Sequence, residues 1–185
     1  MKGRLALVSA LALAAFAFAP GGAVADPNNA PGTWELHLEV PNISEAPNGD
    51  RISVTGSGVF SIHPKSATAS GAFTHTDADG NVVGSGTWTA DKLLSFEFYG
   101  CGVVESLGVT LPANFCGGAL KLDITLTPTG TDIELDGNLT IFCIVGPQAP
   151  SSHDDPSEEG ITLGVPGVAN FNRIVGGMNI YIQTS

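Results

Sequence analysis

Among the side chains that could carry chemistry, His75 has the most suggestive position. It alternates with Phe73 in an extended run, so both side chains fall on the face expected to point inward. An inward imidazole could serve as a general base or hold the polar group of a ligand. We favour the plainer interpretation, a histidine at a strand end that reaches solvent or a backbone carbonyl.

The three cysteines allow one disulfide and leave one thiol over. All three pairings are open from the sequence. We predict Cys101–Cys143, because Cys101 follows one expected strand and Cys143 lies near the end of another, so the bond would join two strand ends. Cys116 would then be free. A structural role or an intermolecular bond fits it better than catalysis, because no histidine lies near it in the chain.

Two groups of oxygen-bearing side chains could bind a cation. Asp77, Asp79 and Asn81 surround Gly80, but the glycine comes too early for a calcium loop, and a hairpin turn explains them better. The densest polar cluster lies in a loop that we interpret as a solvated acidic segment. Its members are His153, Asp154, Asp155, Glu158 and Glu159. No Cys-x-x-Cys spacing supports zinc. We predict no metal and no cofactor.

Catalytic signatures are missing from the sequence. It contains no Gly-x-Ser-x-Gly, no His-Glu-x-x-His, no P-loop and no dinucleotide-binding fingerprint. We therefore lean against an enzyme.

The elements that must position these groups are strands. Apolar residues alternate with polar ones almost everywhere after residue 32, which is the period of a half-buried strand. Pro41 is expected to end the first strand. We predict irregular structure for residues 101–118 and a loop for residues 147–160. About eight strands are expected, over residues 34–40, 52–63, 70–76, 82–100, 120–127, 133–145, 161–165 and 179–183.

The glycine pattern bears on how these strands are arranged. Five glycines fall on the apolar face of long strands, where they would let a sheet bend and close: Gly56, Gly58, Gly84, Gly86 and Gly137. Closure also hides sheet edges. We predict an all-β fold, an antiparallel barrel of about eight strands built from hairpins. A two-sheet β-sandwich is the alternative.

The N-terminus predicts export. Lys2 and Arg4 precede an apolar run over 5–19, and Ala25 ends a small-residue cleavage site. We expect residues 1–25 to be a signal peptide and 26–185 to be a single secreted β domain with no membrane span. Removing the peptide would take two of the seven basic residues and no acidic one, so the mature net charge would be −13. Nucleic acid and anionic membranes are therefore poor partners.

Three functions remain open. The first is a non-catalytic barrel that binds a small apolar ligand, with the inward side chains as its lining. The second is an extracellular structural or interaction domain that acts through its surface. The third, the least favoured, is a barrel enzyme that would use His75 and Tyr99. The predicted ligand-binding residues are Phe60, Phe73, His75, Trp88, Phe96 and Phe98.

Overall fold

The alternating segments form strands in the computed structural model, which describes residues 32–149 and 159–185. The predicted signal peptide lies outside these residues. The described part is all-β, and its one helical element is the short 3-10 turn η2 (Glu105–Leu107). None of its helices has the length and apolar character needed to cross a membrane. The strands are β1 (Thr33–Glu45), β2 (Arg51–Ser61), β3 (Ser66–Thr76), β4 (Val82–Cys101), β5 (Val103–Val104), β6 (Val109–Thr110), β7 (Phe115–Pro128), β8 (Leu135–Cys143), β9 (Gly160–Val165), β10 (Ala169–Phe171) and β11 (Arg173–Gln183).

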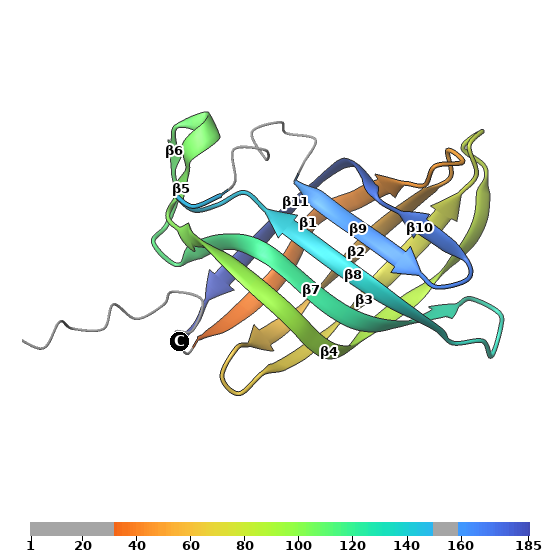
Figure 1. The fold of residues 1–185 in the computed structure, drawn as a ribbon, viewed down its shortest axis with the longest axis horizontal. Helices are drawn as coiled ribbons and strands as arrows, with labels where there is room; N and C mark the ends of the chain where they lie inside the picture. Colours follow the sequence, from red (N-terminus) through yellow and green to blue (C-terminus); the bar gives the residue numbers. More distant parts are fainter. Residues whose placement is uncertain (1–31, 150–158) are drawn as a thin grey trace, which may run out of the picture.

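Nine of these strands make one antiparallel sheet that closes partly on itself. The order is β10-β9-β8-β7-β11-β1-β2-β3-β4, and β7 also pairs with β4. Strands β1, β2, β3, β4, β7 and β11 therefore form a ring of pairings, while β8, β9 and β10 branch from β7. Figure 1 shows the sheet curling round so that β4 lies beside β7. The all-β antiparallel prediction is confirmed, and this partly closed sheet is compatible with both a barrel and a sandwich.

The predicted alternation describes the core well on most strands. In β2, Ile52, Val54 and Phe60 are buried, and the strand runs unbroken through its glycines. In β7, alternate residues from Leu120 to Leu126 are buried. Strand β8 is likewise continuous through Gly137, as predicted. These side chains join one hydrophobic core, whose burial supplies the main stabilisation of the sheet.

Bulges make two predictions wrong. Strand β1 continues through Pro41, because register shifts between Leu38 and Ile43 place the proline where the ladder is already interrupted. In β4, a register shift between Ala90 and Lys92 buries Leu93, where simple alternation would have placed Leu94, and a second shift between Leu93 and Ser95 returns Phe96 to the inner face opposite Leu120. A bulge inserts one residue and so reverses the phase of everything after it.

Strand β11 lies against β8 and β9 without a continuous backbone ladder, and side-chain hydrogen bonds connect them. Strand β7 pairs with β11 only at Phe115 and Cys116, and from Gly118 onward it pairs with β8 on that side. Beyond the two residues that pair with β7, the Asn179 side chain of β11 contacts the paired strands β8 and β9. Its Nδ2 donates to Phe142 O at 3.0 Å and to Gly160 O at 3.1 Å. We call this junction between β11 and the β8–β9 pair the seam.

Two further hydrogen bonds reinforce the seam. Tyr181 Oη donates to Ile141 O at 2.9 Å, and the Cys143 thiol donates to Asn179 O at 3.0 Å. Asn179 Nδ2 also lies 2.9 Å from Asn42 Oδ1 in β1, so its two hydrogens are shared among three acceptors. All four of these side chains are buried. Side-chain donors thus satisfy carbonyls that a regular ladder would pair with backbone N–H groups.

Candidate functional site

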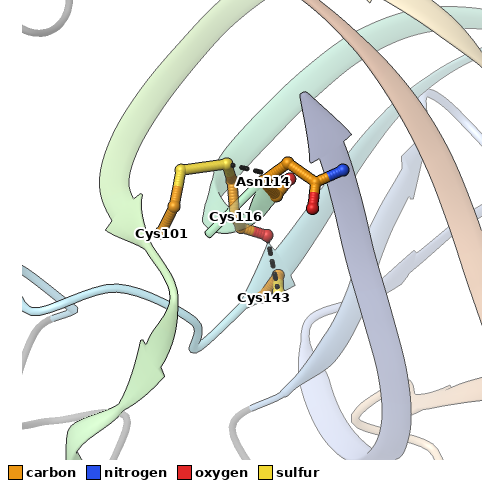
Figure 2. Close-up of a disulfide and its surroundings, with 4 residues drawn as sticks. All are labelled: Cys101, Asn114, Cys116 and Cys143. Carbon is orange, nitrogen blue, oxygen red and sulfur yellow. Dashed lines mark hydrogen bonds between the residues drawn. A yellow bond between two sulfur atoms is a disulfide. The ribbon is translucent and has the colours of Figure 1, made fainter. Parts of the chain in front are cut away.

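The disulfide joins Cys101 to Cys116, which corrects the predicted Cys101–Cys143 bond. The two cysteines are register partners where β4 meets the start of β7, and their Cα atoms are 3.9 Å apart. Figure 2 shows the bond beside the Cys143 thiol, which remains free. The prediction failed because it treated 101–118 as irregular, whereas β7 begins at Phe115 and brings Cys116 back beside Cys101.

The remaining thiol, Cys143, is a buried structural group. Its side chain is fully buried, and burial together with nearby Glu159 raises its pKa far above the ordinary value for a thiol. The thiolate that would be needed for nucleophilic attack is therefore suppressed.

The disulfide closes the base of a loop, residues 102–115, that contains β5, η2 and β6. Gly102 N donates to Phe115 O at 2.8 Å just inside the bond, and Leu111 N donates to Gly102 O at 2.8 Å. Gly108 ends η2 with a φ of 61°, in the left-handed region that favours glycine. Gly146 N donates to Val103 O at 2.7 Å, so the loop is also tied to the segment after β8. In Figure 1 this loop projects beyond the end of the sheet.

An apolar groove of about 570 Å³ lies between this loop and β11. The loop contributes Val104, Leu107, Val109 and Leu111, while Ile144 and Val145 come from the segment after β8. The other wall consists of Phe115, Met178, Ile180 and Ile182. Leu107 is 64% exposed and Met178 is 53% exposed, so this apolar surface faces water. Its volume is within the range of about 300–1,000 Å³ that is usual for small-molecule sites.

Three polar residues interrupt the apolar lining: Glu39, Glu159 and Asn179. Glu159 precedes β9, and its Oε1 accepts a hydrogen bond of 2.9 Å from Asn179 N. Burial raises the pKa of Glu159 from 4.5 to about 7, and the hydrogen bond from Asn179 only partly opposes this shift. Near neutral pH the groove therefore contains a carboxyl group that is divided between its two protonation states.

Glu159 should make stability depend on pH. Its pKa is higher in the folded protein than in the unfolded chain, so between pH 4.5 and about 7 the folded state holds the extra proton. Stability contributed by this residue is therefore greatest below pH 4.5, falls as pH rises through that window, and is lost above about 7. We expect the loss to be on the order of 2 kcal/mol, since the side chain is only partly buried.

Urea unfolding of the wild type and of Glu159→Gln, measured at pH 5 and pH 8, tests this expectation. Relative to Glu159→Gln, the wild type should have a lower free energy of unfolding at pH 8 than at pH 5. Glu134→Gln, at an exposed position, should behave like the wild type. An identical pH dependence in wild type and Glu159→Gln would contradict the assignment.

Three of the six predicted ligand-binding residues pack together in the core. Phe60, Phe96 and Phe98 pack with Trp34 and Tyr181 in an aromatic cluster inside the sheet. The ring centroids of Phe60 and Phe96 are 4.8 Å apart, and those of Phe96 and Tyr181 are 5.4 Å apart. Edge-to-face and tilted contacts at these separations are typical of packed aromatic cores.

Trp88 occupies the space left by a glycine of β2. A Cβ on Gly56 would lie 2.5 Å from the Trp88 ring, and Trp88 Nε1 donates to Thr55 O at 2.9 Å. Phe73 similarly lies over Gly86. Gly56 and Gly86, two of the five glycines on the apolar face, thus each lie against a large aromatic ring. Contact of the six predicted residues with a ligand remains a prediction.

Phe73 and His75 line a smaller apolar cavity of about 150 Å³ near the far end of β7. His75 Nε2 is 3.2 Å from Asp50 Oδ2, and its ring meets Phe171 edge-on with centroids 5.4 Å apart. Ser85 also borders this cavity but is exposed, on the face of β4 opposite to the inward glycines, so it does not complete a Ser–His–Asp arrangement.

Tyr99, the other residue considered for catalysis, lies near the opposite end of β4 from the His75 cavity. Its side chain is buried, and desolvation raises its pKa to about 12. A phenol with this pKa stays protonated at neutral pH. Because Tyr99 and His75 lie near opposite ends of β4, they do not share one site.

The predicted hairpin turn at Asp77 is confirmed. Asp77 Oδ1 accepts hydrogen bonds from Asp79 N at 3.0 Å and from Asn81 N at 2.8 Å, which closes the β3–β4 turn. Of the acidic cluster, only Glu159 is among the described residues; His153, Asp154, Asp155 and Glu158 lie outside them. In residues 32–149 and 159–185, no three His, Cys, Asp or Glu side chains gather in a way that could hold a metal ion.

Sequence reasoning missed the groove because its loop wall lies in the segment interpreted as irregular. A signal was present: Leu107, Val109 and Leu111 alternate with the period of a strand.

Comparison of the chain with protein-family models, curated proteins and solved structures gave no match.

Proposed function

We propose that this protein is an exported, non-catalytic binding protein that holds a small apolar ligand in the groove between the disulfide-closed loop and β11. The observation that carries the proposal is the groove itself: about 570 Å³ with ten apolar side chains and three polar ones around it. Ligand sites of soluble proteins have this mixture of apolar walls and a few polar groups.

Energetics favour occupancy of the groove. Leu107 and Met178 keep a large part of their surface in water, and covering apolar surface contributes about 25 cal/mol per Å². The disulfide and the Gly146–Val103 hydrogen bond hold the loop in place before a ligand arrives. Preorganisation of this kind reduces the entropy that binding would otherwise cost.

Export is supported by two features. The N-terminal segment has the pattern of a signal peptide, and disulfides persist mainly in oxidising compartments. A closed disulfide at the base of the groove is consistent with function outside the cytoplasm.

A fluorescent apolar probe, N-phenylnaphthylamine, tests the proposed site. We expect Met178→Asp to weaken probe binding about tenfold or more, because it places a charge on the apolar wall. Since Met178 is exposed, the substitution should leave the fold intact.

Val168→Asp is the matched control, because Val168 is also exposed and borders the small His75 cavity instead. It should leave probe affinity unchanged. Loss of binding in Val168→Asp but not in Met178→Asp would move the ligand to the cavity of Phe73 and His75. No saturable binding to the wild type would favour the surface-interaction alternative.

A further inference from the structure

The groove has an unbalanced set of charges. Among the described residues, the two ionisable side chains that line the groove, Glu39 and Glu159, are both acidic, and no lysine, arginine or histidine lines it. Glu39 lies in β1 at the bulge between Leu38 and Val40, which pair with Asn179 and Met178 of β11. Glu159 accepts its hydrogen bond from Asn179 N. Both carboxylates are thus placed beside the same short stretch of β11.

From this arrangement we infer that the ligand is a cationic amphiphile, an alkyl or aromatic body with a protonated amine, and not a fatty acid or another anion. This inference rests on the proposed function. The apolar body would cover Leu107 and Met178, while the amine would lie beside Glu159 and Glu39. The whole chain, with a net charge of −11, also attracts cations and repels anions.

The physical reason is the partly buried carboxyl group of Glu159. Burial removes water from this group and disfavours its charge, and Asn179 N provides one hydrogen bond but no positive charge. A bound ammonium would supply the missing counter-charge and further hydrogen-bond donors. A bound carboxylate would instead meet the like charge of the partly buried Glu159, with the exposed Glu39 close by, which is unfavourable.

Three probes of equal carbon number and different head group show how much the charge of the head group contributes to binding. Decylamine, decanol and decanoate are titrated at about pH 8 against protein loaded with N-phenylnaphthylamine. We expect decylamine to displace the dye at a concentration about tenfold or more below that of decanoate, with decanol between them. Glu159→Gln should bring decylamine and decanoate to within about threefold of each other, and Glu134→Gln should leave the order unchanged.

The outcomes distinguish this inference from the function on which it rests. If the three probes compete equally, or decanoate competes best, and Met178→Asp still weakens binding, the cation preference is wrong and the groove remains a binding site. If Met178→Asp has no effect on any probe, both proposals fail. Should Glu159→Gln not fold, decylamine and decanol are compared on the wild type at pH 5, where Glu159 is mostly protonated: an unchanged preference for decylamine at that pH overturns the inference.

Discussion

Replacing Asn179 with leucine is expected to lower the free energy of unfolding by about 3 to 5 kcal/mol. Leucine is similar in size but donates no hydrogen bond, so Phe142 O, Gly160 O and Asn42 Oδ1 lose the two amide hydrogens that they share. A buried acceptor left without a partner costs about 1–3 kcal/mol. Chemical denaturation of wild type and variant measures the loss.

A second measurement tests whether the loss of stability in Asn179→Leu arises at the seam. The Cys143 thiol is buried and donates to Asn179 O, so in the native wild type it should react slowly with a thiol reagent. In Asn179→Leu it should react much faster, because opening of the seam becomes easier.

Asn170→Leu is the control, since Asn170 is exposed in β10. It should change stability by less than about 0.5 kcal/mol. Equal stability of Asn179→Leu and Asn170→Leu would show that the seam is not held by the Asn179 side chain.

Loss of the Cys101–Cys116 disulfide is expected to lower stability by about 3 kcal/mol, whether by reduction or by the double substitution Cys101→Ser, Cys116→Ser. The cysteines are separated by 15 residues, and a loop of that length released in the unfolded chain gains entropy of this size. Denaturation with and without reductant measures the effect, and the double variant should be insensitive to reductant.

Cys143→Ser decides between the two pairings. With the bond between Cys101 and Cys116, this variant keeps its disulfide and its sensitivity to reductant. If Cys143→Ser instead lost that sensitivity, the pairing described here would be wrong and the bond would involve Cys143.

The aromatic residues show where prediction from the sequence stopped. Alternation correctly placed Phe60 and Trp88 on the inward face, because the two faces of a strand differ in their access to water. It could not say that Trp88 would fill the space beside Gly56, or that Phe60 would pack against Phe96 and Tyr181. Those contacts join residues far apart in the chain, and no local pattern specifies them.

The all-β class, most strands and the hairpin at Asp77 were predictable from the sequence, since each follows from the period of apolar residues or from the chemistry of a few neighbouring groups. Three other features became visible only in the folded chain: the bond between Cys101 and Cys116, the burial of Leu93, and the groove that a loop and β11 enclose beside Glu159. The reason is that register, bulges and ring closure depend on which strands meet, and a shift of one residue exchanges the inner and outer faces of everything beyond it.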